Sequence, residues 1–257
     1  MSIVLPTAKS PAVTKSPKNL IIFSKPKVGK TSLIAELPNC LILDLESGSD
    51  YVDAMSLKAS TVSEIREIGK AIIDAGKPYD YIAVDTITAL ETMCIKEAER
   101  LYMKTPMGKG SWIKKLPNGN IDPESGKVKY GNVLNLPNGQ GYGYLREAVV
   151  KVIEEIKTYA PRVILLGHVK DAMIEKSGAE VNSMDLDLTG KIKRIVSSQS
   201  DAIGYMYRKG NQNILSFKTK DEISCGARPA HLRNQEIVVS ELLEGEFKTH
   251  WDQIYID

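Results

Sequence analysis

Short apolar runs alternate with segments of helical spacing along most of the chain. The apolar runs cover residues 20–23, 40–45, 81–84 and 163–166. Between them, apolar residues recur every three or four positions, which predicts helices over 31–37, 63–75, 87–103 and 144–158. Strands that are apolar throughout are typical of a parallel sheet covered by helices on both faces. The pattern therefore predicts an α/β fold with a doubly wound, mostly parallel sheet.

One segment interrupts this alternation. Residues 105–143 contain eight glycines and four prolines, which do not fit a helix or a buried strand. Within them, residues 120–128 have the composition of a hairpin closed by a Pro/Gly turn. A connection of this length inside a compact domain is uncommon and is usually functional or mobile. We therefore expect an inserted Gly/Pro-rich hairpin or loop at 105–143.

The two ends of the chain lack the strand–helix pattern. Residues 1–18 alternate Lys, Ser and Pro, and proline restricts the residue before it to extended conformations, so they predict a flexible N-terminal arm. This arm is either a frayed end or a segment that packs on a neighbouring subunit. Residues 236–257 predict a C-terminal tail that packs on the core or on a partner through Trp251, Ile254 and Tyr255. The predicted domain covers residues 19–235.

Composition narrows the class of protein without choosing a function. The chain has 257 residues, and 34 Lys and Arg against 32 Asp and Glu leave a net charge of only +2. Its apolar and charged fractions are those of a globular protein, which excludes disordered, collagen-like and coiled-coil classes. No apolar run approaches the roughly 18 residues of a membrane span, and the first twenty residues have no signal-peptide core. Three isolated cysteines without metal-ligand spacing indicate reduced thiols: Cys40, Cys94 and Cys225. We expect a cytoplasmic protein without a membrane partner.

The segment between the first strand and the first helix has the composition of a phosphate-binding loop. The Walker A pattern is Gly-x4-Gly-Lys-Ser/Thr, and the chain matches it at Gly29, Lys30 and Thr31 but has Ser24 in place of the first glycine. Gly29 lets backbone N–H groups turn toward phosphate oxygens, Lys30 can reach the β- and γ-phosphates, and Thr31 can ligate Mg²⁺. The alternative is an incidental basic turn. The predicted nucleotide-binding residues are Ser24, Lys25, Pro26, Lys27, Val28, Gly29, Lys30, Thr31 and Ser32.

A carboxylate stands at the end of the third apolar strand. Asp85 closes the run 81–85, and ligands bind at the carboxyl ends of strands in sheets of this kind. It fits the Walker B role, in which an Asp holds Mg²⁺ together with Thr31. The alternative is a cap for the helix that follows, a role that Thr86 could also fill.

Two further strand ends carry candidate catalytic residues. Asp44 and Glu46 lie on one side of the second strand, and hydrolysis requires a carboxylate that orients the attacking water. Glu46 lies further out and is our choice, although it could equally begin an ordinary acidic loop. His168 ends the fourth strand, where it could sense the γ-phosphate or serve only a structural role.

These positions, in this order, resemble the RecA-type ATPase core. The chain is similar in particular to phage nucleotide-binding proteins of that superfamily, which include RecA-like single-strand annealing proteins. The matching stretches are 23–31, 41–46, 81–86 and 163–168, and the similarity extends over about residues 19–235. The resemblance implies ATP hydrolysis with Mg²⁺, coupled to single-stranded DNA binding in a homo-oligomeric ring or filament. A phage single-strand-binding protein would be a further partner. It also implies catalytic roles for Lys30, Glu46 and His168, with Thr31 and Asp85 at the metal.

The same resemblance places DNA in two loops, which here are residues 105–143 and 169–190. Around the first loop, six lysines stand against two acids, and aromatic residues are interleaved with them. Basic charge follows a phosphate backbone, and aromatic side chains can stack on bases. The alternative is a solvated surface loop. The predicted DNA-binding residues are Lys109, Trp112, Lys114, Lys115, Lys127 and Lys129. The second loop is nearly neutral.

Oligomeric ATPases of the RecA type often complete the site with a cation from the next subunit. Lys218 and Lys220 resemble the paired lysines used in this way, and Arg208 and Arg228 are alternatives.

Three functions remain open at this point. The first is a DNA-dependent ATPase of phage recombination or annealing. The second is a nucleotide-gated DNA-binding protein with little or no hydrolysis, suggested by Ser24. The third is a P-loop kinase for a small molecule, which would have no use for Glu46 as a water-orienting base. Kinases usually place the Asp85-type strand directly beside the phosphate-loop strand, whereas we expect the strand that ends at His168 between them.

Overall fold

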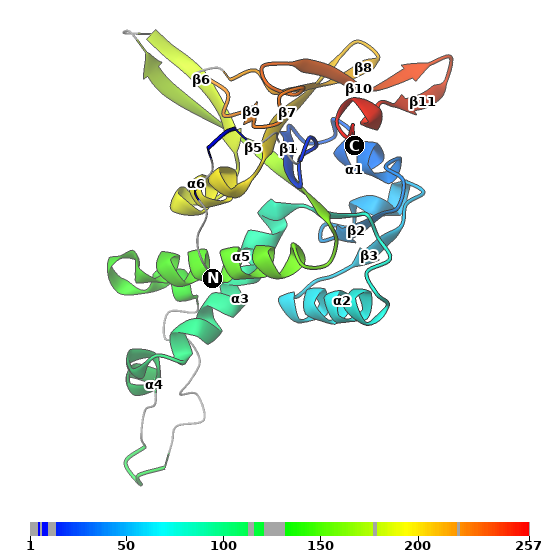
Figure 1. Cartoon of the computed structure of the whole chain (residues 1–257). Coiled ribbons are helices and arrows are strands. Elements are labelled where there is room, and N and C mark those ends of the chain that lie inside the picture. Colours follow the sequence, from blue (N-terminus) through cyan, green and yellow to red (C-terminus); the bar gives the residue numbers. More distant parts are fainter. Residues whose placement is uncertain are drawn as a thin grey trace.

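The computed structural model describes residues 5, 7–9, 14–112, 116–120, 132–176, 179–219 and 222–256, with the backbone alone at 110–112, 172–176 and 179–182. Its centre is a twisted sheet whose strands follow the order β11-β10-β8-β7-β1-β5-β4-β2-β3 (Figure 1). The predicted hairpin at 120–128 falls almost entirely outside the described residues.

One half of the sheet is parallel. It consists of β1 (Asn19–Ser24), β5 (Arg162–Lys176), β4 (Tyr81–Asp85), β2 (Cys40–Asp44) and β3 (Ser56–Lys58). β5 lies between β1 and β4, as the sequence predicted for the strand that ends near His168. This order also separates the fold from the usual arrangement of P-loop kinases.

The other half begins with β7 (Ala202–Lys209), which is parallel to β1, and then turns antiparallel. It continues through β8 (Gln212–Ser216), β10 (Glu236–Leu243) and β11 (Glu246–Thr249), and the short β9 (Gly226–Ala227) pairs with β7. The segment expected as a C-terminal tail therefore contributes two strands to the sheet. Beyond residue 168, β5 pairs with β6 (Ala179–Leu186) as a two-stranded ribbon that projects from the body (Figure 1). The expectation of a loop at 169–190 is corrected accordingly.

Successive side chains of the central strands point to opposite faces of the sheet, and helices cover both faces. Ile21 and Phe23 face one apolar cluster, whereas Leu20 and Ile22 face the other. The first cluster contains α2 (Val62–Asp74), α3 (Ile87–Met103), α5 (Gln140–Ile156) and α6 (Gly190–Gln199). The second contains α1 (Lys30–Ala35) and the C-terminal segment around Trp251. The prediction of a largely parallel sheet with helices on both faces is confirmed.

The interrupting segment is more helical than its composition suggested. Residues 106–112 form α4 (Pro106–Trp112), and α5 begins at Gln140, inside the expected loop. Two short 3₁₀ turns precede α5, at Val133–Asn135 and Pro137–Gly139. Gly141 of α5 lies so close to the first turn that a Cβ would stand 2.0 Å from the Val133 carbonyl oxygen. Glycines that suggested a loop thus serve close packing.

The segment before β1 and the C-terminal segment both pack on the body, the first from Ser16 onward. Ser16 is buried, and its Oγ accepts a hydrogen bond from the Ile256 N–H. The Trp251 indole donates to the Leu33 carbonyl oxygen of α1 at 3.0 Å. Residues 16–18 therefore belong to the packed body rather than to a flexible arm. Among the described helices, none combines the length and the apolarity that crossing a membrane requires.

Candidate active site

The carboxyl ends of four parallel strands bring the predicted catalytic positions to one edge of the sheet. Ser24 of β1 is in register with His168 of β5. Asp85 of β4 is in register with Leu166 of β5 on one side and with Asp44 of β2 on the other. Ligands bind at this edge in open α/β sheets, where loops leave the strands.

The loop after β1 has the backbone conformation that the phosphate-loop pattern requires at its second glycine. Gly29 has φ +109°, in a region that side chains disfavour, and Lys27 also has positive φ. Ser24 does not, so the pattern's first glycine is not needed here for conformational reasons. Ser24 is fully buried, and its hydroxyl donates to the Lys25 carbonyl oxygen at 2.8 Å. The departure at Ser24 is therefore compatible with a closed loop.

Lys30 is a buried ammonium with a neutral partner. Its side chain is 7% exposed, and Nζ donates to Ser24 Oγ at 3.0 Å. Burial lowers the pKa of Lys30, and the negative charges of Asp85 and Glu46 partly oppose this shift. A buried cation whose hydrogen-bond partner is neutral favours an anion in the loop, which is the role expected of it toward phosphate.

Thr31 and Asp85 touch each other. The Thr31 hydroxyl donates to Asp85 Oδ2 at 2.6 Å, and burial raises the pKa of Asp85. Thr86, which follows across a cis peptide bond, caps α3 by accepting from the Ala89 N–H, so Asp85 is not needed as the cap. In the part of the chain described, no three His, Cys, Asp or Glu side chains gather as a metal site. A hydroxyl and one carboxylate fit Mg²⁺ held mainly by phosphate oxygens and water.

Asp44 and Glu46 were expected on one side of the second strand, but β2 ends at Asp44 and Glu46 lies in the bend that follows it. Asp44 is 2% exposed and accepts from the N–H groups of Glu46, Gly48 and Ser49 and from the Ser49 hydroxyl. Glu46 projects further, and its Oε2 lies 3.1 Å from His168 Nε2. Asp44 therefore fixes the turn at residues 46–49. Glu46 is the carboxylate of this pair that water can reach.

His168 joins two segments at the site. Its ring contacts Glu46 through Nε2, and its backbone N–H donates to the Thr88 hydroxyl at 3.4 Å. The buried Nδ1 has no hydrogen-bond partner among the described residues. Because β5 continues from His168 into the β5–β6 ribbon, the residue that contacts Glu46 belongs to the same strand as that ribbon.

The other predicted cations do not all lie at this edge. Arg208 Nη2 donates to the Val28 carbonyl oxygen of its own phosphate loop at 3.2 Å. Lys218 pairs with Glu236 at 2.7 Å, and Arg228 donates to Ser198 O at 2.7 Å and lies 3.5 Å from Asp201. Lys220 is outside the described residues.

The predicted DNA-binding residues are described only in part. Lys109 is exposed on α4, and Trp112 ends the same helix. Lys114, Lys115, Lys127 and Lys129 lie outside the described residues.

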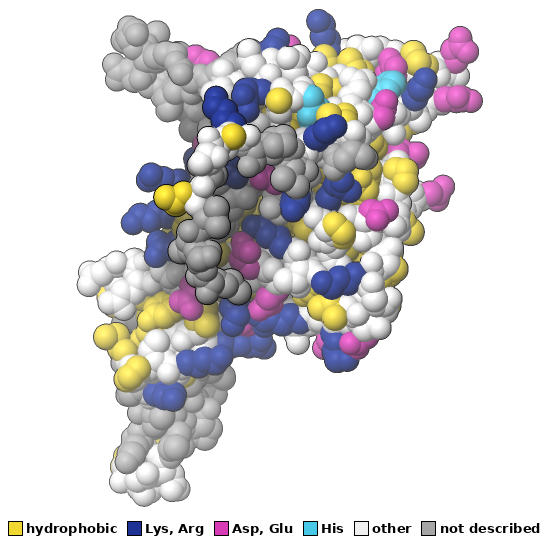
Figure 2. All heavy atoms as spheres, in the orientation of Figure 1, with side chains coloured by type: hydrophobic (Ala, Val, Ile, Leu, Met, Phe, Trp, Pro, Cys, Tyr) yellow, Lys and Arg dark blue, Asp and Glu magenta, His cyan; other side chains and the backbone are white. Residues whose placement is uncertain are grey.

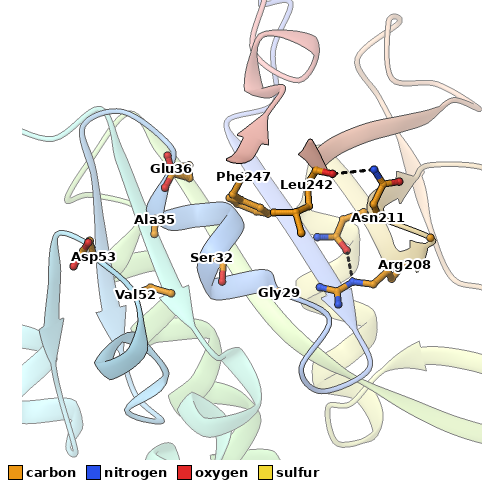
Figure 3. A pocket seen from close by; sticks show the side chains of 12 residues that line it. Gly29, Ser32, Ala35, Glu36, Val52, Asp53, Arg208, Asn211, Leu242 and Phe247 are labelled. Atoms are coloured by element: carbon orange, nitrogen blue, oxygen red, sulfur yellow. Dashed lines mark hydrogen bonds between the residues drawn. The ribbon is translucent and has the colours of Figure 1, made fainter. Parts of the chain in front are cut away.

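A cavity of about 520 Å³ opens beside Gly29 (Figure 3). Ala35, Val52, Leu242 and Phe247 supply apolar walls. Its polar lining consists of Ser32, Glu36, Asp53, Arg208, Asn211 and Asn213. Figure 3 shows α1 between Val52 and Asp53 on one side and the strands that carry Arg208 and Leu242 on the other. Sequence reasoning missed this cavity because its walls come from four separate segments with no motif of their own.

Gly48, like this cavity, was not identified from the sequence. A Cβ at this position would stand 3.3 Å from Thr31 Oγ1 and 3.6 Å from Asp85 Oδ2. The glycine therefore leaves room directly at the Thr31–Asp85 pair. Its only sequence signal was a place two residues after Glu46.

Replacement of Asp44 by Asn should destabilise the fold by about 1–3 kcal/mol, because an amide cannot accept all four hydrogen bonds. Burial alone would raise the pKa of Asp44, but these bonds outweigh it and the pKa is lowered. The carboxylate's contribution is therefore present above about pH 4 and is lost as the pH falls through the lowered pKa of the folded state. Urea unfolding at pH 7 and in acid measures this, with exposed Asp252→Asn as control. An Asp44→Asn deficit that is equal at both pH values would contradict the assignment.

The comparisons with known proteins agree with this geometry. The family described as AAA domain matches residues 16–228, well over half of the chain. No curated protein matches it. The matched range includes the phosphate loop, the Thr31–Asp85 pair, Glu46, His168 and Arg208. The chain belongs to the AAA domain family, whose members are usually nucleotide-binding P-loop ATPases.

Proposed function

We propose that the chain is a Mg²⁺-dependent ATPase that binds single-stranded DNA in phage recombination or annealing. The observation that carries the ATPase part is the Glu46–His168 contact of 3.1 Å at the same sheet edge as the Thr31–Asp85 pair. A nucleotide-binding loop alone would serve binding, transfer or hydrolysis. A carboxylate beside that loop, exposed enough to meet water, favours hydrolysis.

Each group at the edge has a distinct role in this proposal. Lys30 binds the β- and γ-phosphates, and Thr31 and Asp85 would hold Mg²⁺, which supplies positive charge to the phosphate oxygens when bound. Glu46 orients a water and accepts its proton. The water oxygen then bonds to the γ-phosphorus as the bond from that phosphorus to the bridging oxygen breaks, and ADP leaves. His168, which contacts Glu46, senses the loss of the γ-phosphate.

The cavity beside Gly29 suits the base and ribose of the nucleotide. Its apolar walls can cover a flat ring, and its amide and carboxylate side chains can hydrogen-bond to the edge of that ring. Its position next to the loop lets one molecule occupy both.

The DNA-binding part draws support from a second surface. A cavity of about 390 Å³ lies between the N-terminal parts of α5 and α6, which begin within the last residues of the two predicted DNA loops. Arg146 and Lys191 line it, and Tyr142 beside them is 47% exposed. Lys and Arg side chains also gather over α6 (Figure 2). Cations next to an exposed aromatic ring fit a backbone phosphate and a stacked base.

Assembly and partners are extensions of the same proposal. The resemblance to RecA-type ATPases supports a homo-oligomer, as a ring or a filament, and a phage single-strand-binding protein as a further partner. A second candidate function, nucleotide-gated DNA binding with little hydrolysis, is favoured by the hydrogen bond from Lys30 to Ser24, which stands where the Walker A pattern has glycine.

The experiment that tests the function is ATP hydrolysis with Mg²⁺, titrated with single-stranded DNA and then with duplex. The proposal expects hydrolysis that single strands stimulate more than duplex. Binding of ATP without turnover would favour the nucleotide-gated protein, whereas turnover indifferent to DNA would remove DNA from the proposal.

The double change Arg146→Gln/Lys191→Gln should weaken binding to single strands of any sequence and flatten the salt dependence of that binding. For each DNA phosphate that the variant no longer neutralises, the slope of log affinity against log salt should become shallower by about 0.7 for single strands. Fluorescence anisotropy with a labelled oligonucleotide at several salt concentrations measures both. The matched control is Lys77→Gln/Lys248→Gln, which removes the same charge from exposed positions elsewhere. Equal losses of affinity in the two double variants would indicate net charge rather than a site.

The same measurement on variants of Lys109, Lys114 and Lys115 tests the predicted loop.

A further inference from the structure

Arg208 stands at the phosphate loop of its own subunit. β7 runs parallel to β1, with Tyr205 opposite Phe23, so the end of β7 reaches the edge where the loop begins. We propose that Arg208 binds a phosphate of the nucleotide held by its own loop, at the end nearest the ribose, with Asn213 as its positioning residue. This inference rests on the proposed nucleotide binding and goes beyond it, because the resemblance predicted a cation from the neighbouring subunit.

Uncharged groups hold the guanidinium in place. Nη2 donates to the Val28 carbonyl oxygen at 3.2 Å, and Nε donates to Asn213 Oδ1 at 3.3 Å. Asn213 is 4% exposed and is itself fixed, because its amide donates to the fully buried Ser240 hydroxyl at 2.9 Å. This series of hydrogen bonds runs from β10 through β8 and β7 to the loop. These hydrogen bonds orient the Arg208 guanidinium but do not neutralise its positive charge.

The charge of Arg208 has no carboxylate partner within the described parts of the chain. Arg66, by contrast, pairs with Glu97 and Glu155 at 3.0 and 2.8 Å. Glu36 and Asp53 line the same cavity, but neither makes an ion pair with Arg208; Figure 3 shows Glu36 at the far end of α1 and Asp53 on the other side of that helix. A guanidinium that is oriented by neutral groups next to a phosphate loop favours a phosphate as its counter-charge.

The position of Arg208 along the loop indicates which part of the nucleotide it meets. A Cβ built on Gly29 would stand 3.4 Å from Asn213 Nδ2 and 3.7 Å from Arg208 Nη2. Arg208 thus lies where the loop meets the cavity, whereas Glu46 and the Thr31–Asp85 pair mark the end where hydrolysis occurs. A contact at the cavity end is present with ADP and with ATP alike. It therefore contributes to affinity for both and little to the hydrolytic step.

The first test measures the affinities of purified Arg208→Gln for ADP and for ATP with Mg²⁺ by titration calorimetry. We expect both to fall by about ten- to a hundredfold, since the variant cannot make a charged hydrogen bond to the phosphate. Turnover at saturating ATP should fall by a smaller factor than the affinity does. Arg208→Lys should recover part of the affinity. The matched control is Arg233→Gln, an exposed arginine that also donates to a backbone carbonyl, and it should bind both nucleotides as the parent does.

The second test asks which subunit supplies the arginine. Arg208→Gln is mixed with Lys30→Ala, and hydrolysis is measured at ATP concentrations well below half-saturation. If Arg208 acts within its own subunit, the mixture gives only the sum of its parts. Recovery toward parental activity would show that an intact arginine from one subunit serves the intact loop of another, and would overturn the proposal.

The outcomes separate this inference from the proposed function. If the parent protein binds neither ADP nor ATP, the proposed function fails. If the parent binds both and a folded Arg208→Gln binds them equally well, only the assignment of Arg208 fails. Thermal melting of each variant identifies loss of folding. If Arg208→Gln does not fold, the nucleotide affinities of Arg208→Lys, which keeps the charge, are compared with those of the parent instead.

Discussion

Lys30→Ala should lower ATP turnover by at least about a hundredfold. The ammonium is buried at the phosphate loop, where a positive charge contributes much more to transition-state stabilisation than it would in water. Its hydrogen-bond partner is the neutral Ser24 hydroxyl, which competes only weakly with a phosphate for the charge. Hydrolysis of ATP with Mg²⁺ at several concentrations, with and without single-stranded DNA, measures the decrease.

Loss of folding would not explain that result. Burial lowers the pKa of Lys30, which means that the charged form disfavours the folded state at neutral pH, and alanine removes this cost. We therefore expect a melting temperature for Lys30→Ala at or above that of the parent. Lys25→Ala is the matched control, since Lys25 is exposed in the same loop and should cause a much smaller decrease in turnover. Comparable decreases at Lys25 and Lys30 would leave only the net charge of the loop as an explanation.

Local spacing was sufficient to predict the part of the site that one segment supplies. Gly29, Lys30 and Thr31 are consecutive, and the apolar run before them identified β1. Asp85 and His168 could be predicted because buried parallel strands are apolar to their ends. Arg208 and Asn213 could not be placed there, because only the pairing of β1 with β7, far apart in the chain, brings them to the loop.

The elements that were missed have weak hydrophobic patterns. β5 continues to Lys176, but beyond His168 it forms a two-stranded ribbon outside the sheet, so the apolar pattern ends while the strand does not. In β10 the buried Ile237 and Val239 flank the more exposed Val238, and the buried residue that follows them is the polar Ser240, so this short stretch resembles a tail in sequence. Strands that lie on one side of a sheet or outside it lack the continuous apolar run that identified the others.

The choice between Asp44 and Glu46 shows the limit of periodicity. Alternation places both carboxylates on one side of the strand, and no spacing rule separates them. Three backbone N–H groups turn onto Asp44, a consequence of the turn at 46–49, and only coordinates reveal them. The same turn directs the Glu46 side chain toward His168. Asp44, by holding the turn, therefore positions Glu46 for the proposed reaction.

Glu46→Gln should leave ATP binding near the parental affinity and slow hydrolysis by about 10²–10⁴-fold. Gln has the same shape and can still contact His168, but its amide cannot accept the proton of the attacking water. ATP affinity by calorimetry and single-turnover hydrolysis measure the two effects separately. Asp50→Asn is the control, because Asp50 is a nearby exposed acid that pairs with Lys58.

Parental turnover in Glu46→Gln would remove Glu46 from the reaction. The predicted result would also supply a protein that holds ATP without consuming it. If that protein binds single strands with ATP as tightly as the parent does, nucleotide occupancy is enough for binding and hydrolysis serves release. If it binds them more weakly, turnover itself is needed to form the complex. Because Gln at position 46 can still contact His168 and β5 itself is unchanged, a difference in DNA binding would follow from the loss of hydrolysis.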